Sequence, residues 1–214
     1  MDFERDYIMR MIQMMGDFFR RIADMVDDRE RALLIDAQAR QHCGMPLATA
    51  EALEPDMLAE LLPPAQRFVM SELLHTKGRA CASLPAAHRE ALLLQSLRLL
   101  STLNGDQFAQ RAAQLQTLKR ELYARLTAPD LMRCARFFAQ AEAFDAMEDA
   151  LFQALAFLAG EDWLTSADEG MLLLRRAAKA DEFTLALCNM TRQELWESAH
   201  ELSVEYRKRT GGSA

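Results

Sequence analysis

Two Glu-x-x-His patterns have the residue types and spacing that could support metal chemistry. They pair Glu72 with His75 and Glu197 with His200. Residues three positions apart lie on one face of a helix, so each pair could share a metal ion. Di-iron carboxylate bundles use two such pairs, together with a Glu from each of two further helices. The four residues are therefore candidate ligands under an alternative interpretation, a di-iron-type metal-binding helical bundle.

The apolar residues around these pairs argue against that interpretation, because the ligands of a bundle project into its interior. Around the second pair, the apolar side of the expected helix is formed by Leu195, Ala199, Leu202 and Tyr206. Glu197 and His200 lean away from that side. Around the first pair, Leu73 marks the apolar side, so Glu72 and His75 are expected to face water. We predict no metal site and no cofactor.

Other catalytic patterns are missing from the sequence. The chain has no Gly-x-Ser-x-Gly elbow and no local signature of a catalytic cysteine. Its eight glycines form no phosphate-binding loop. His42 adjoins Cys43, but neighbouring side chains on a helix point in different directions and do not form a catalytic pair. The sequence predicts no catalytic residue, and we expect a protein that is not an enzyme.

Composition indicates an all-α protein. The 214 residues are half hydrophobic, poor in Gly and Pro, and rich in strong helix formers, with no alternating β-branched run. Thirty-two acidic against 25 basic residues give a net charge of −7, which disfavours a nucleic-acid partner. No apolar run reaches the roughly 20 residues that a membrane span needs.

Cysteine usage and the first residues predict a cytoplasmic location. Four widely separated cysteines are typical of buried, reduced thiols: Cys43, Cys81, Cys134 and Cys188. The N-terminus is acidic, whereas an export signal begins with basic residues.

Apolar periodicity predicts an N-terminal helical arm (1–44), a proline-containing connection (45–64), an array of helical hairpins (65–208) and a flexible basic tail (209–214). Within the array we expect helices at about 65–76, 86–103, 107–126, 130–141, 144–159, 167–179, 182–189 and 191–208. Thr191 and Glu194 form a capping box at the start of the last helix, and Thr165 with Ser166 offers another N-cap.

The segment from Asp130 to Ala159 is the clearest hairpin. It resembles a tetratricopeptide-like unit, which is a helix, a tight turn and a helix in about 34 residues. Glu142 stands where such units usually have Gly. The pattern small, acidic, any, Phe recurs in three joints that end at Phe108, Phe144 and Phe183. In each joint we expect the acidic residue to cap a helix and the Phe to fill the groove between two helices.

The N-terminal helix, about residues 3–26, has a broad Met-rich apolar stripe. Three interpretations remain open: a core helix, a dimerisation helix and a membrane-surface helix. An excess of acidic residues disfavours the last. The candidate dimer contacts are Tyr7, Met11, Met15, Phe18 and Ile22.

Short motifs at both ends are similar to those of an uncharacterised bacterial all-helical family. They are the segment from Asp6 to Ile12, the Asp181-Glu182-Phe183 joint, and the capped helix that starts at Thr191. The resemblance implies an all-helical fold with a tetratricopeptide-like middle. It brings no established activity, catalytic residue or cofactor.

We therefore predict a non-catalytic protein-interaction or scaffold module. Stacked hairpins leave one row of helices facing a groove, and on that face we nominate Arg133, Arg136 and Gln140. A basic patch at Arg175, Arg176 and Lys179 is either a solvated face or a site for an acidic peptide terminus. A homodimeric structural protein without a separate ligand is the other alternative.

Overall fold

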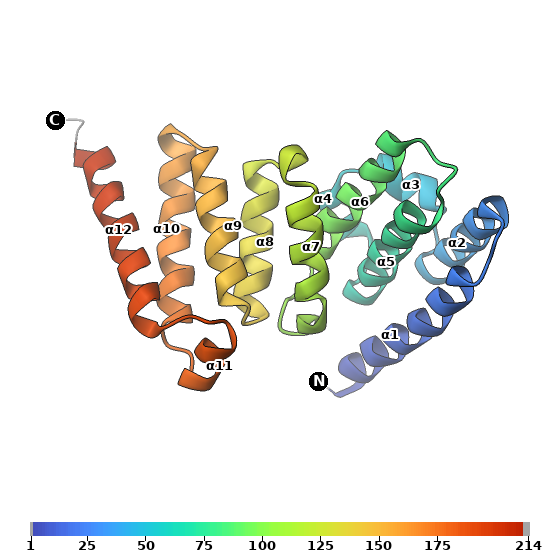
Figure 1. The fold of residues 1–214 in the computed structure, drawn as a ribbon, viewed down its shortest axis with the longest axis horizontal. Coiled ribbons are helices and arrows are strands. Elements are labelled where there is room, and N and C mark those ends of the chain that lie inside the picture. The colour runs from blue at the N-terminus through green and yellow to red at the C-terminus, as the bar shows by residue number, and fades with distance from the viewer. Residues whose placement is uncertain (1, 212–214) are drawn as a thin grey trace. The chain divides into compact units, whose positions relative to one another are not determined.

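The computed structural model describes the backbone of residues 2–211 and the side chains of residues 10–211. Over this range the chain is all-α, as predicted, and contains no strand (Figure 1). Contacts divide it into two compact units. One comprises Met1–Leu103 and Thr117–Arg125, and the other comprises Asn104–Gln116 and Leu126–Ala214. No helix within 2–211 combines the length and the apolar character needed to cross a bilayer.

The first unit is built around α5. Its helices are α1 (Asp2–Ala23), α2 (Asp28–Cys43), α3 (Leu47–Ala52), α4 (Pro55–Leu61), α5 (Pro64–Ala80) and α6 (Ala86–Leu100). Helix α5 packs against all five others, and every residue from 68 to 74 is buried. Helices α5 and α6 approach so closely that a Cβ on Gly78 would lie 3.0 Å from the Leu93 side chain.

The predicted connection at 45–64 contains helices α3 and α4. Pro46 is the N-cap of α3 and Pro55 occupies the first turn of α4, positions where proline starts a helix instead of breaking one. Both helices pack against α5, and their apolar residues Leu47, Ala50 and Leu58 are buried. This segment therefore contributes to the core of the first unit.

Helix α1 packs on α5 through the stripe that the sequence proposed for dimerisation. Met11, Met15, Phe18 and Ile22 are all at least nine-tenths buried within a single copy of the chain. The side chain of Tyr7 lies outside the described residues. A dimer formed through these four side chains would require α1 to leave its own unit.

The second unit contains α8 (Ala128–Gln140), α9 (Phe144–Ala156), α10 (Gly160–Ala177), α11 (Glu182–Leu187) and α12 (Arg192–Gly211), which follow the predicted order (Figure 1). Helices α8 and α9 form the predicted hairpin. Helix α10 packs chiefly against α12, so these two form a second hairpin with α11 in their connection. Stacked antiparallel hairpins of this kind are compatible with a tetratricopeptide-like arrangement.

Two predicted helices differ most from the observed ones. The helix expected at 107–126 is broken into η1 (Ala109–Arg111), α7 (Ala112–Glu121) and η2 (Tyr123–Arg125). It does not begin at 107, because the N–H groups of Gln107 and Phe108 donate to the carbonyl of Asn104 in a turn. Helix α10 begins at Gly160, seven residues before the predicted start at 167. Its first turn carries two acidic residues, which interact favourably with the positive end of the helix dipole. Because the helix begins at Gly160, the proposed N-cap at Thr165 and Ser166 lies inside it.

The three joints do not behave alike. Phe108 and Phe144 are buried, as expected. Phe183 is 73% exposed, because it lies on the short α11, which buries only Leu185. Only the acid of the third joint is an N-cap: Asp181 accepts a hydrogen bond from the N–H of Thr184 at 2.9 Å.

The predicted flexible tail begins one turn too early. Helix α12 continues through residues 209–211, and the guanidinium of Arg209 lies 3.9 Å above the centre of the Trp163 ring. Trp163 is 4% exposed, whereas Trp196 is 45% exposed.

Candidate functional site

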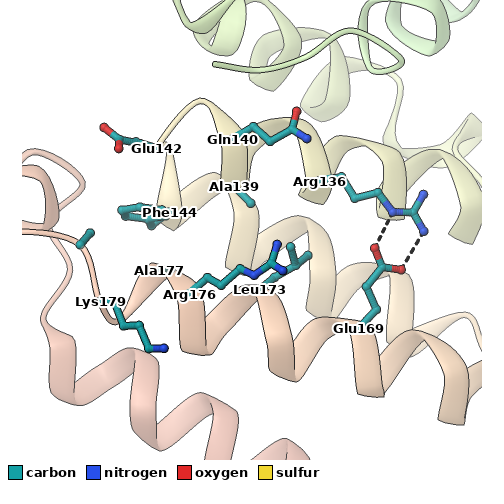
Figure 2. Close-up of a pocket in the computed structure, with 11 residues that line it drawn as sticks. Arg136, Ala139, Gln140, Glu142, Phe144, Glu169, Leu173, Arg176, Ala177 and Lys179 are labelled. Carbon is teal, nitrogen blue, oxygen red and sulfur yellow. Dashed lines mark hydrogen bonds and ion pairs between the residues drawn. The ribbon is translucent and has the colours of Figure 1, made fainter. Parts of the chain in front are cut away.

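A surface hollow of about 510 Å³ lies between α8 and α10, the first helices of the two hairpins (Figure 2). Helix α8 contributes Arg136, Ala139 and Gln140 to its wall, and α10 contributes Glu169, Leu173 and Arg176. The turns at the ends of these helices add further residues, among them Glu142 and Lys179. The hollow is therefore formed by the row of helices on which the sequence predicted a partner surface. We call it the α8/α10 groove.

The sequence of α8 fixes which side chains reach the groove. Thr127 and Asp130 form a capping box: the N–H of Thr127 donates to Asp130 at 3.0 Å, and the N–H of Asp130 donates back to the Thr127 hydroxyl. The apolar row of α8 is buried, chiefly against α9: Leu131, Cys134, Ala135 and Phe138. Since residues opposite this row point outward, Arg136 is exposed on the groove side.

Helix α10 presents an amphipathic stripe to the same groove. Glu169, Leu173 and Arg176 follow one another at four and three positions, so they lie on one helical face. The neighbouring face of the helix contacts α9, where a Cβ on Gly170 would lie 2.7 Å from a methyl of Leu151. This close approach positions α10 against α9 beside the stripe.

Arg136 and Glu169 form a bidentate ion pair across the groove. The Nε and Nη2 atoms of Arg136 donate to the two carboxylate oxygens of Glu169 at 2.5 and 2.7 Å. These hydrogen bonds raise the pKa of Arg136 above its ordinary value. Both side chains stay partly exposed, at 48% for Arg136 and 33% for Glu169. The pair links α8 to α10 and remains accessible to solvent.

Two further cations of the groove are not engaged. Arg176 and Lys179 are exposed and form no hydrogen bond or ion pair with the side chains described for residues 10–211. In Figure 2 the guanidinium of Arg176 points into the space between α8 and α10. Arg175, the preceding residue, is also exposed but does not line the groove. The position of Arg176 therefore distinguishes it from an ordinary solvated arginine.

A second hollow, of about 360 Å³, lies further toward the N-termini of α8 and α10. Arg136 lines both hollows, and Arg133 lines the second. Arg133 is partly buried, and its Nη2 atom donates to Asp130 at 2.9 Å. The Arg136–Glu169 pair therefore lies where the two hollows adjoin.

The three predicted partner residues have different roles. Arg136 lines the groove and is accessible. Arg133 is tied to Asp130 at the start of α8. Gln140 is exposed, but its side-chain oxygen accepts a hydrogen bond from the N–H of Gly105 at 2.8 Å and so anchors the preceding loop. Sequence reasoning missed the contribution of Glu169 and Leu173, whose spacing from Arg176 was the available signal.

The four candidate metal ligands of the alternative interpretation divide between the two units. Glu72 and His75 belong to the first unit, whereas Glu197 and His200 are exposed on α12 of the second. The expectation that Glu72 faces water is wrong. It is 4% exposed, because α5 is surrounded by helices at that level. Among the described side chains, no three His, Cys, Asp or Glu residues are grouped as metal ligands would be.

A hollow between α9 and α12 has the opposite electrostatic character. It measures about 690 Å³ and carries six carboxylates and no cation: Asp145, Glu148, Asp149, Glu194, Glu197 and Glu201. Several of these acids are engaged locally; Glu148, for example, accepts a hydrogen bond from Ser198. An acidic ligand would be repelled by this hollow. It would therefore favour the α8/α10 groove over the hollow between α9 and α12.

Comparison with known proteins assigns the chain to a family. Residues 2–207 match the Family of unknown function (DUF6483), so the chain belongs to that family. No curated protein and no solved structure matches the chain. The family is consistent with the resemblance read from the sequence and leaves the biochemical role open.

Proposed function

We propose that this DUF6483 protein is a non-catalytic interaction module whose α8/α10 groove binds an acidic segment of a partner protein. The observation that carries the proposal is the placement of Arg176 and Lys179, two cations without a partner among the described side chains, in a hollow between two adjacent helices. Cations held at a concave surface attract carboxylates and increase the rate of encounter with them.

The apolar part of the groove supports a peptide over a free anion. Leu173 and Ala139, which are partly exposed, lie among the charged residues of the groove. A peptide side chain can cover such carbon atoms while its neighbouring carboxylate meets Arg176. Helical stacks are suited to this task, because they fill their interiors with side chains and present an extended surface.

Fluorescence anisotropy with short labelled peptides tests the proposal. The probe contains Glu and Leu, and the matched peptide replaces each Glu by Gln. We expect the Glu peptide to bind, and to bind more weakly as salt is added, because exposed charges are screened. The Gln peptide should bind far more weakly.

Charge-reversed variants locate the site. Replacing Arg176 and Lys179 by Glu should weaken binding of the Glu peptide by about tenfold or more, since two favourable charge contacts become repulsive. Arg175→Glu is the matched control: it makes the same charge change one residue away, outside the groove. The proposal is wrong if the Glu peptide does not bind, or if Arg175→Glu weakens binding as much as Arg176→Glu does.

A further inference from the structure

The Arg136–Glu169 pair gives the groove a feature that the proposed function does not use. Arg136 lines both hollows, but a carboxylate of the same chain is already paired with it. Glu169 approaches Arg136 with both carboxylate oxygens, which is the geometry that a partner carboxylate would adopt. Glu169 therefore stands where a ligand acid would bind.

Exchange of one carboxylate for another at this position costs little. Both members of the pair are partly exposed, so water screens their attraction and can solvate Glu169 when it is released. No backbone movement is needed, because Glu169 lies on the outer face of α10, which α9 holds in place at Gly170. A partner acid that arrives already bound through a neighbouring contact can thus replace Glu169.

That neighbouring contact is available at a defined spacing. Arg176 lies seven residues beyond Glu169 on the same face of α10, which is two helical turns or about 10 Å. Leu173 lies between them. In a polyproline II segment, side chains three residues apart point to the same side and are separated by about 9 Å. Two acids spaced in this way would reach Arg176 and Arg136 together.

We propose that the partner segment carries two acidic residues three positions apart in an extended conformation, and that the second acid displaces Glu169 from Arg136. This inference rests on the proposed function of the groove and adds to it the spacing of the ligand acids. Glu169 then acts as an internal competitor. It lowers the gain in affinity that a second carboxylate brings, because the Arg136–Glu169 pair must be broken first.

Fluorescence anisotropy with labelled peptides tests the spacing. One peptide has a single Glu, and the others have two Glu placed one, three or six positions apart. In the Glu169→Gln variant, in which Arg136 has no internal carboxylate, we expect the peptide with spacing three to bind best, by about fivefold over the single-Glu peptide, as one further surface ion pair allows. In the unmodified chain one ion pair replaces another, so the same preference should be smaller. Equal affinities for all two-Glu spacings would overturn the inference.

Two variants test the exchange itself. Glu169→Gln keeps the size of the side chain but removes its charge, so affinity for the spacing-three peptide should rise while that for the single-Glu peptide stays the same. Arg136→Gln should lower the affinity for the spacing-three peptide to the affinity for the single-Glu peptide. Thermal unfolding of both variants checks that the unit remains folded. If Glu169→Gln tightens both peptides equally, Glu169 acts only as a general negative charge and the exchange is refuted.

The spacing preference and the binding of Glu peptides are separate readouts. If Glu peptides bind without any preference for spacing, only the inference about the spacing is refuted. If no binding depends on Arg176 and Lys179, the proposed function is refuted, and the inference is refuted with it.

Discussion

The N–H of Gly105 donates a hydrogen bond to the side-chain oxygen of Gln140 at 2.8 Å, and the same glycine lies against the last turn of α8. A Cβ added at Gly105 would lie 2.1 Å from the carbonyl oxygen of Phe137 and 2.9 Å from the backbone nitrogen of Ala141. Both obstructing atoms belong to the backbone of a packed helix end and cannot move aside as a side chain could. The loop at 104–108 is therefore fixed to α8 by a position that only Gly fills.

Gly105→Ala should lower the free energy of unfolding by about 3 kcal/mol, the upper end of the usual cost of overpacking. Chemical denaturation followed by circular dichroism measures this change. Gly16→Ala is the control: Gly16 lies within α1 with nothing within 4 Å of its Cβ position, so Ala should raise stability by about 0.5–1 kcal/mol. Equal effects of the two substitutions would contradict the close approach of Gly105.

Local patterns predicted the helical class and much of the hairpin at Asp130–Ala159, because a periodic apolar row is a property of neighbouring residues. Phe144 was placed correctly for the same reason, since a helix faces it. Phe183 shares the motif, but it lies on the short α11, which buries only Leu185. The motif alone could not reveal that difference.

The candidate site was predicted in part. Arg136 could be assigned to an outward face from the apolar row of α8 alone. The bond from Gly105 to Gln140 and the pair with Glu169 join residues more than thirty positions apart, which local periodicity does not encode. The burial of Glu72 has a similar origin. An apolar stripe predicts one solvent-exposed face of a helix, but α5 is covered by several helices. Pairing between distant segments is the information that the sequence patterns lacked.

Arg209 shields the indole of Trp163, with its guanidinium 3.9 Å from the ring centre. Arg209→Ala should make Trp163 fluorescence more accessible to acrylamide and lower stability by about 0.5–1 kcal/mol, the value of an exposed cation–π contact. The exposed Trp196 contributes the quenchable background, so the measurement is made in a Trp196→Phe background. Arg207→Ala, an exposed position on the same helix, should leave the quenching unchanged.

Glu194 should make the stability of α12 sensitive to acid. The N–H and hydroxyl of Thr191 donate to its carboxylate at 2.7 and 2.8 Å, and these hydrogen bonds lower the pKa of Glu194. A lowered pKa in the folded state contributes stability above the unfolded value, about 4.3, and that stability is lost as the pH falls through the folded value.

A pH series of thermal unfolding tests this expectation. Glu194→Gln keeps a capping side chain but cannot ionise, so the midpoint should fall less steeply below about pH 4.3 than in the unmodified chain. The control is Glu201→Gln, an exposed position of α12 that forms no hydrogen bond with the side chains described for 10–211. If both variants flatten the pH profile equally, the capping box is not the cause.

The cysteines should differ in reactivity. Burial raises the pKa of Cys43 to about 12 and also raises the pKa of Cys81, so neither forms much thiolate near neutral pH. Cys134 is buried as well, whereas Cys188 is partly exposed at the end of α11. Iodoacetamide at pH 8 should therefore modify Cys188 first, as judged by mass spectrometry. In Cys188→Ser the fast phase should disappear, and modification of the remaining thiols should require unfolding.

Met15 tests whether the Met-rich stripe of α1 serves the core of a single chain. Its side chain is fully buried, and α1 packs on α5. Met15→Ala should lower the free energy of unfolding by about 2–5 kcal/mol, the usual cost of a buried Met-to-Ala cavity. Gln13→Ala, at an exposed position of the same helix, should have almost no effect.

Sedimentation of the Met15→Ala variant separates core packing from dimerisation. If the stripe serves the core, stability falls at every protein concentration and the mass per particle equals that of the unmodified chain. If the stripe instead joins two copies, the variant loses mass per particle and its midpoint of unfolding depends on concentration. That second pattern would contradict the packing of α1 on α5.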